Sequence, residues 1–336
     1  MMNAVWAPVR KSIKIKGIGI LVLTVLLLGC SKQPKATVPD AGMGNGAAAQ
    51  SGNTPNTTEA AEGPITVENV GFETPESVYH LAASDVYLVS NISGSPLEKD
   101  NNGFITRLSP DGSVPTLKWI AGGENGVTLN APKGMTIADD VLYVTDIDVV
   151  RMFDVANGAA KGDIKIEGAT FLNDLTTAAD GAVYVSDTGW KAGENGFENT
   201  GTDAIWKIVD GRATKVPARA DLGNPNGLLA STERIWMVNA KGELFEITED
   251  GAMGTPTQLP GGGLDGIVQT GGNTLLISSW GAKSVFEGTA GGKFVPVAKD
   301  ISSPADIGYD AKRNRLLVPV FTENKVQIIP LPPMLN

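Results

Sequence analysis

The chain has 336 residues and a formal net charge of −10, with 41 glycines but only one cysteine and one histidine. A protein this acidic is repelled by polyanions, which argues against nucleic acid as a partner. The single cysteine excludes a disulfide within the chain. The single histidine excludes metal sites and catalytic centres that need two or more histidines.

The first 29 residues have the features of an export signal. Four basic residues precede an apolar run of 12 residues, Gly17 to Leu28, which is too short to span a bilayer. The run ends in LLGC, which resembles the lipobox of bacterial lipoproteins, where the cysteine is lipidated and becomes the mature N-terminus. We therefore predict a signal peptide over residues 1–29 and a lipid anchor at Cys30. A lone core cysteine is the alternative.

The residues after Cys30 predict where the protein is held. Ser31 stands in place of the aspartate that retains lipoproteins at the inner membrane, so we expect the periplasmic face of the bacterial outer membrane. Residues 30–64 contain no apolar cluster and are typical of a flexible linker. Cleavage of the signal removes four positive charges from a net charge of −10 and leaves −14. Residues 65–336 form the predicted domain, which we expect to be monomeric.

A repeated pattern runs through this domain. Each repeat has a Pro- or Gly-rich entry, an apolar strand, a short polar turn and a second strand, followed by one or two more strands. Equivalent positions are 57, 40, 53, 39 and 40 residues apart, which is the length of a four-stranded propeller blade. The sequence therefore predicts an all-β, six-bladed β-propeller.

The two ends of the domain complement each other. The last repeat is one strand short, and residues 65–71 (ITVENVG) supply a spare strand. Pairing this strand into the last blade would close the ring and remove two exposed sheet edges. An open solenoid is the alternative.

One position recurs at the entrance to the innermost strand of every blade, where side chains point toward the central axis. We call the six residues there the first ring. Its carboxylate and amide oxygens are hard ligands of the kind that calcium prefers, and none of its members suits zinc or copper. We predict one divalent cation, most simply Ca²⁺, with turn capping as the alternative explanation for these residues. The predicted ligands are Glu76, Asn173, Asn226 and Asp265, and the other two members are Lys133 and Ala305.

Lys133 complicates this prediction, because an ammonium group next to a divalent cation is repelled. One explanation is that the long side chain directs the charge away from the cation or that burial lowers its pKa. The other is that Lys133 neutralises the two carboxylates and replaces the metal. We favour the first explanation, and the sequence leaves both open.

A second ring follows 13 to 15 residues after the first, where the second strand of each blade returns. If each hairpin starts and ends on one face, both rings line the same funnel. Asp146 and Asp187 are then candidates for a general base, with turn capping as the alternative. The remaining members of the second ring are Asn91, Asn239, Ser279 and Val320.

The blade entrances resemble those of the gluconolactonase, regucalcin and luciferin-regenerating-enzyme family, and more distantly the paraoxonases, over residues 65–330. The shared motifs are PE at 75–76, FLND at 171–174, PNGL at 225–228 and LDG at 264–266. The resemblance implies a six-bladed propeller with one catalytic divalent cation, usually calcium, and hydrolysis of lactones or related esters. It also implies that Glu76, Asn173, Asn226 and Asp265 are the ligands of that cation.

The chain departs from this family where a base is needed. Asn239 stands where regucalcin-like members have an aspartate, and Lys133 stands where paraoxonases have a histidine. A lactonase needs a cation to polarise the substrate carbonyl and a base to activate water. A free aspartate, with a pKa near 3.9, is a poor base at neutral pH unless burial raises that pKa. Lys133 is a candidate to bind the lactone carbonyl or the acid product.

Further residues near the strand ends are candidates for substrate contact. We expect Asn91, Asp148, Asn239, Ser279 and Trp280 to contact the substrate, and the insertion at 190–203 to be either a lid or idle surface. The leading hypothesis is a cation-dependent hydrolase of a small lactone or ester. The first rival is a non-catalytic propeller that binds a ligand or protein in the funnel. A sugar-dehydrogenase-like propeller is weaker, because its histidine base could only be His80, which we expect to be structural.

Overall fold

A computed structural model of the chain describes residues 63–333, except residues 195 and 232–233. The predicted signal peptide, Cys30 and all but the last two residues of the linker lie outside this part, so these remain predictions. In the part that is described, no helix is long and apolar enough to cross a membrane.

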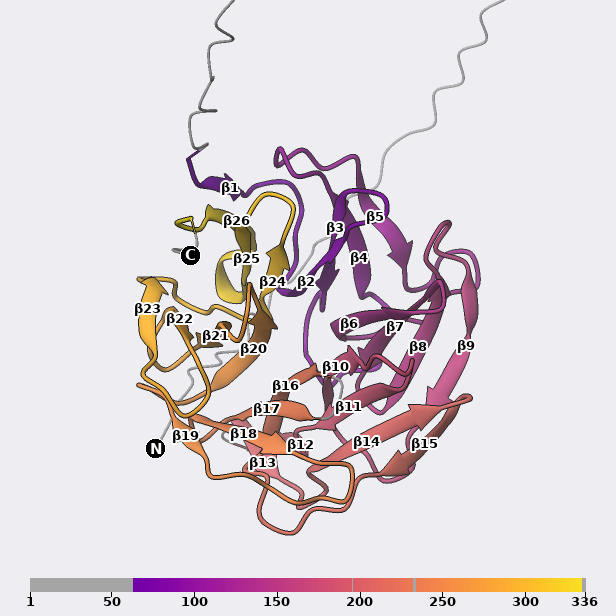
Figure 1. Cartoon of the computed structure of the whole chain (residues 1–336). Helices are drawn as coiled ribbons and strands as arrows, with labels where there is room; N and C mark the ends of the chain where they lie inside the picture. The colour runs from indigo at the N-terminus through magenta and orange to yellow at the C-terminus, as the bar shows by residue number, and fades with distance from the viewer. Residues whose placement is uncertain (1–62, 195, 232–233, 334–336) are drawn as a thin grey trace, which may run out of the picture. The chain divides into compact units, whose positions relative to one another are not determined.

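Six antiparallel sheets of four strands each are arranged around a central axis, which confirms the predicted six-bladed propeller (Figure 1). Within blades 1 to 5 the strands are ordered in chain order from the axis outward, because consecutive antiparallel strands pair with one another through the turns and loops that join them. Blades 1 to 3 consist of β2 (Pro75–Leu81), β3 (Val86–Asn91), β4 (Phe104–Leu108), β5 (Thr116–Ala121), β6 (Pro132–Ala138), β7 (Val141–Asp146), β8 (Val149–Asp154), β9 (Ala160–Lys165), β10 (Leu172–Thr177), β11 (Val183–Asp187), β14 (Ala204–Val209) and β15 (Arg212–Lys215).

The other three blades follow the same plan. Blade 3 carries in addition a separate hairpin between β11 and β14, and a short 3₁₀ helix, η1 (Phe321–Glu323), lies within blade 6. The strands of blades 4 to 6 are β16 (Pro225–Ala230), β17 (Ile235–Asn239), β18 (Glu243–Ile247), β19 (Thr257–Gln258), β20 (Leu264–Gln269), β21 (Leu275–Ser279), β22 (Ser284–Gly288), β23 (Val295–Ala298), β24 (Gly308–Asp310), β25 (Arg315–Val320), β26 (Lys325–Pro330) and β1 (Ile65–Val67), and those of the hairpin are β12 (Trp190–Gly193) and β13 (Gly196–Asn199).

The N-terminal strand closes the ring, as predicted. β1 pairs antiparallel with β26, and Thr66 lies opposite Gln327. Val67 packs in one apolar cluster with Val326 of blade 6 and Val89 of blade 1. Closure therefore joins the first and last parts of the domain through backbone hydrogen bonds and through burial of apolar side chains.

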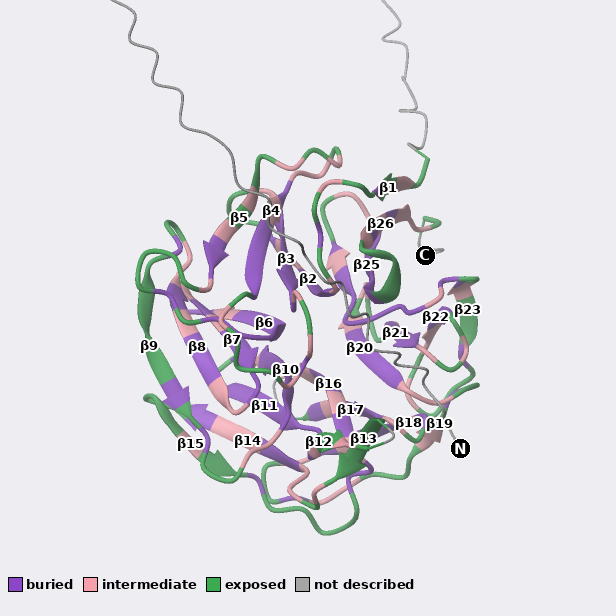
Figure 2. Ribbon diagram, turned by 180° about the vertical axis from the view of Figure 1, so that it is seen from behind, coloured by how far each residue is buried: buried purple, intermediate pink, exposed green. Residues whose placement is uncertain are grey.

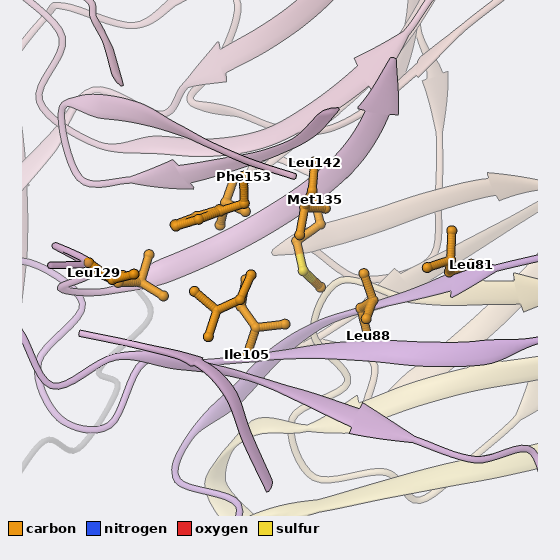
Figure 3. Close-up of a cluster of buried hydrophobic side chains, with 10 residues drawn as sticks. Leu81, Leu88, Ile105, Leu129, Met135, Leu142 and Phe153 are labelled. Carbon is orange, nitrogen blue, oxygen red and sulfur yellow. The ribbon is translucent and has the colours of Figure 1, made fainter. Parts of the chain in front are cut away.

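Apolar clusters between neighbouring blades form the core. In one of them, Leu88 and Ile105 of blade 1 pack with Met135, Leu142 and Phe153 of blade 2 (Figure 3). Figure 2 shows that burial is greatest in the inner and middle strands and that outer strands such as β9 are exposed. The faces of the blades thus hold the inner strands in fixed positions around the axis.

The inner strands approach one another so closely that some positions have no room for a side chain. A Cβ atom built on Gly266 would lie 2.3 Å from the backbone nitrogen of Ile307 and 2.8 Å from the Cα of Asp306. Gly134 and Gly227, at the same position in their own blades, are equally crowded. Glycine is required there by the close approach of the next inner strand.

We expect Gly266→Ala to destabilise the propeller by about 1–3 kcal/mol, because the backbone of blade 6 must move to admit the methyl group. The midpoint of denaturant unfolding measures this effect. Lys293→Ala, at an exposed turn of blade 5, is the control and should change stability by less than about 0.5 kcal/mol. Equal midpoints for the two variants would contradict the close approach.

Candidate functional site

The first ring lies where the inner strands begin. Each member follows the residue that opens the pairing of the inner strand with its neighbour, at a register shift in the ladder of blades 1 to 5. Such a bulge redirects a side chain relative to the regular pleat. The ring is withdrawn from solvent: the exposed fractions are 6% for Glu76, 1% for Lys133, 4% for Asn173 and 5% for Asp265, whereas Asn226 is half-buried.

Two of the predicted ligands have a buried oxygen without a partner. Glu76 Oε2 and Asp265 Oδ1 have no hydrogen-bond donor among the described residues. The other carboxylate oxygen of Asp265 accepts a hydrogen bond of 2.5 Å from Trp280 Nε1, and the side chain of Asn226 also bonds Asp265. Buried polar atoms are almost always paired, so these two oxygens are free to accept a donor or a cation.

The amide of Asn173 is oriented by its neighbour. Its Nδ2 donates a hydrogen bond of 3.0 Å to Thr188 Oγ1, and Thr188 in turn donates one of 2.7 Å to the carbonyl oxygen of Pro225. The amide nitrogen of Asn173 is therefore occupied by a hydrogen bond within the protein, and its amide oxygen remains available as a cation ligand.

Two further carboxylates at the axis were missed by the sequence analysis. Asp174 accepts hydrogen bonds of 2.7 Å from the backbone nitrogens of Leu175 and Leu228, and Asp306 accepts one of 2.5 Å from Ser77 Oγ. Both follow a first-ring residue directly, so the same alignment of repeats shifted by one position would have found them. That shifted set is Ser77, Gly134, Asp174, Gly227, Gly266 and Asp306.

Burial raises the pKa of all four axial carboxyl groups, and neighbouring carboxylates add to this effect for Glu76, Asp174 and Asp265. Burial, with the Asp306 carboxylate nearby, raises the pKa of Asp265 to about 8, and burial raises that of Asp306 to about 7. Burial, with Asp265 nearby, holds the pKa of Glu76 well above its usual range, and burial and Asp306 do the same for Asp174. A bound cation would favour the charged forms and reverse these shifts.

Lys133 does not lie between the carboxylates. Its Nζ donates to the carbonyl oxygens of Pro96 (3.2 Å) and Ala131 (3.1 Å) and lies 4.5 Å from the ring centre of Phe171. Burial lowers the pKa of Lys133 to about 8, although Glu76 and Asp146 act in the opposite direction. This placement agrees with the explanation in which the long side chain directs its charge away from the ring.

The expectation that both rings line one funnel is wrong. Asn91, Asp146 and Asp187 pair with Pro75, Pro132 and Leu172, the residues that precede the first-ring members. Along the regular second strand, Ser90, Thr145 and Ser186 lie opposite the bulged first-ring positions and alternate with the second-ring residues, so the two rings do not share a face.

The two aspartates proposed as bases are occupied by structural hydrogen bonds. Asp146 accepts from the backbone nitrogens of Asn130 and Ala131 and forms a 2.8 Å ion pair with Arg151 Nε. Asp187 accepts from the nitrogens of Phe171 (2.9 Å) and Gly189 (3.0 Å), and burial raises its pKa. Both are fully buried. Their placement favours capping of the preceding loop over activation of water.

The predicted substrate contacts in the second ring have similar partners. Asn91 Oδ1 accepts from Glu73 N, Asn239 Oδ1 accepts from Lys241 N, and Ser279 Oγ donates to the carbonyl oxygen of Gly262. All three side chains are fully buried, so none of them is exposed to a substrate. They fix the loops that lead into the inner strands.

Two other predicted contacts remain accessible. Trp280 is half-buried, holds Asp265 through its Nε1 and lies 5.3 Å from the ring of Phe321. Asp148 is half-buried and pairs with Lys99 at 2.7 Å. Of the two, only Trp280 touches the first ring.

Below the first ring, a cavity of about 300 Å³ follows the axis between the inner strands. Asp174 and Asp306 line it, and so does His80. The imidazole of His80 lies 3.5 Å from Asp310 and 3.6 Å from Asp85, so it joins blade 1 to blade 6, as expected for a structural histidine.

The donor set defines what the first ring can hold. Within residues 63–333, no three Asp, Glu, His or Cys side chains are placed to share a metal ion. The predicted set has two carboxylates and two amides, so a cation there would depend on Asn173 and Asn226 as well as on Glu76 and Asp265. The two unpaired carboxylate oxygens fit a hard divalent cation.

Comparisons with known proteins locate this fold among solved structures. No family model and no curated protein matches the chain. A gluconolactonase from Xanthomonas campestris is 18% identical with a TM-score of 0.60, covering 80% of this chain and 89% of that one. A luciferin-regenerating enzyme is 12% identical with a TM-score of 0.58, covering 80% and 96%. A streptogramin B lyase is 13% identical with a TM-score of 0.55, covering 81% and 99%. The chain shares their fold.

If Asp146 is structural, Asp146→Asn should lower the free energy of unfolding by about 3 kcal/mol, because it removes a buried charge that Arg151 and backbone donors require. Asp148→Asn is the matched control, and loss of its partly exposed ion pair should cost at most about 1 kcal/mol. Chemical denaturation measures both. An Asp146→Asn protein of unchanged stability would favour a role in catalysis instead.

The raised pKa values of Asp265 and Asp306 predict a pH dependence. Between about pH 4 and pH 8 the folded protein keeps protons that the unfolded chain has released, so without a cation stability falls as pH rises through this range. Calcium would offset this loss by stabilising the charged carboxylates. The rise in melting temperature between EDTA and calcium should therefore be small at pH 5 and largest at pH 8. A rise of equal size at both pH values would contradict this account.

Proposed function

We propose that the protein is a hydrolase of a small lactone or ester that depends on a divalent cation, most simply Ca²⁺, held by Glu76, Asn173, Asn226 and Asp265. The observation that carries the proposal is the pair of unpaired buried oxygens on Glu76 and Asp265. The shared fold with a gluconolactonase supports the substrate class.

The protein's own residues would prepare this site. A cation bound there would polarise the carbonyl group of the substrate and stabilise the negative charge that develops on its oxygen. Trp280 and Asn226 hold Asp265, and Thr188 holds Asn173, so the oxygens are oriented before any ligand arrives. Lys133 adds positive charge beside the ring without contacting its carboxylates.

The proton of the attacking water needs an acceptor. The carboxylates of Asp146 and Asp187 already accept several hydrogen bonds and are fully buried. Glu76 and Asp265 each keep one oxygen without a donor. Because these two oxygens are the proposed ligands of the cation, which would also lower the pKa of both groups, the acceptor must be a group other than Glu76 and Asp265.

Two alternatives have different requirements. A virginiamycin B lyase of similar fold is described in a catalytically inactive form with a histidine replaced by alanine. The only histidine here, His80, lies between Asp85 and Asp310, which does not favour that chemistry. A propeller that binds a ligand without turning it over would need the first ring but no proton acceptor. An assay of lactone hydrolysis distinguishes this alternative from the proposed hydrolase.

We also propose that the propeller is tethered to the outer membrane through lipidated Cys30 and acts in the periplasm. The proposal rests on the LLGC sequence and on the small, polar residues that follow it. An extended linker would let the propeller reach soluble substrates away from the membrane surface.

Glu76→Gln should leave the protein folded but weaken calcium binding and abolish turnover of a lactone panel. Because a direct ligand is lost, the fall in affinity should exceed the roughly 10- to 100-fold cost of removing an outer partner of a ligand. Calorimetry and a pH-indicator assay, with and without EDTA, measure the two effects. Glu124→Gln, at an exposed turn, is the control. Full activity of Glu76→Gln would contradict the site.

A further inference from the structure

Blade 3 carries a hairpin that stands apart from the six blades. In the described part of the chain, β12 and β13 form the one two-stranded sheet outside the four-stranded blades. Trp190 and Phe197 lie on one face of this hairpin, where their rings stack 5.2 Å apart at 14°. Lys191 and Glu198 pair at 3.5 Å on the other face, which is polar and exposed. The hairpin is therefore apolar on one side only.

The apolar side is incompletely covered. Trp190 and Phe197 both make edge contacts with Phe171, at 5.7 and 5.6 Å between ring centres. We call Phe171, Trp190 and Phe197 the aromatic patch. Phe171 is buried, whereas Phe197 remains 45% exposed. An aromatic side chain this exposed leaves apolar surface in contact with water, and a bound apolar ligand would bury that surface.

The aromatic patch is continuous with the first ring. Phe171 precedes Asn173 by two residues, and the ammonium group of Lys133 lies over its ring at 4.5 Å. Thr188, which holds the amide of Asn173, precedes Trp190 by two residues. The aromatic patch therefore contacts Lys133, a member of the first ring, on the side of blades 2 and 3.

We propose that the aromatic patch binds a planar, apolar group of the substrate, so that the enzyme acts on lactones or esters bearing an aromatic ring rather than on polyhydroxylated sugar lactones. This inference rests on the proposed hydrolase function for its chemistry but concerns a separate part of the site. Stacked and edge-on aromatic rings favour a flat apolar partner. Apart from the indole N–H of Trp190, the three rings themselves carry no hydrogen-bonding group for a sugar.

The test compares dihydrocoumarin with glucono-δ-lactone as substrates of the calcium-loaded, full-length propeller. Phe197→Ala should raise KM for dihydrocoumarin about 3- to 10-fold, the loss expected for one aromatic contact, and leave kcat and the sugar lactone unaffected. Lys191→Ala, on the opposite face of the same hairpin, is the matched control and should change neither. Circular dichroism checks that both variants fold.

A second measurement separates this inference from the proposed function. Chroman has the rings of dihydrocoumarin but no ester, and its binding can be followed by saturation-transfer NMR whether or not the protein hydrolyses anything. Weaker binding of chroman to Phe197→Ala than to the wild type and Lys191→Ala supports the aromatic patch, even if no lactone is turned over. Equal chroman binding by all three proteins, or an unchanged KM for dihydrocoumarin in Phe197→Ala, overturns it while leaving the hydrolase proposal standing.

Discussion

The burial of four carboxyl groups at the axis is the constraint on which the candidate site depends. Glu76, Asp174, Asp265 and Asp306 come from four different blades, and each has a raised pKa, chiefly because burial disfavours the charged form. Neighbouring carboxylates add to this effect for the first three. Such a cluster is stable when its members keep their protons or when a cation compensates their charge. Asp174 and Asp306 have hydrogen-bond donors from neighbouring inner strands, whereas Glu76 and Asp265 each retain an unpaired oxygen. Protein donors therefore compensate Asp174 and Asp306, whereas Glu76 and Asp265 each keep an oxygen that is available to a ligand.

The closed ring is what forces these groups together. Apolar packing between blades fixes each inner strand, pairing of β1 with β26 prevents the ring from opening, and glycine at 134, 227 and 266 lets neighbouring inner strands approach closely. The second ring also helps to fix the inner strands, since residues such as Asp146 accept hydrogen bonds from the loops that lead into them. Residues that stabilise the fold and residues of the candidate site thus occupy neighbouring positions in the same repeat.

The sequence predicted the repeat and the closure, because both depend on periodic patterns of residues. It failed for the second ring, because the face on which a side chain lies depends on register, and a shift of one residue is invisible to a pattern of similar segments. Asp306 was missed because the first-ring position of its blade is the apolar Ala305, which gave no sign of a carboxylate at the next residue. For Lys133 the sequence favoured a charge directed away from the ring, but it could not identify the partner, which is the carbonyl of Pro96 in the loop between β3 and β4.

Proton release on calcium binding tests the central claim most directly. Calorimetric titration of calcium at pH 7, repeated in buffers of different ionisation enthalpy, counts the protons that leave the protein with each ion bound. The account predicts one calcium ion per chain and a net release of protons, because the ion lowers the raised pKa values of the axial carboxyl groups. Absence of binding, or binding without any exchange of protons, would contradict it.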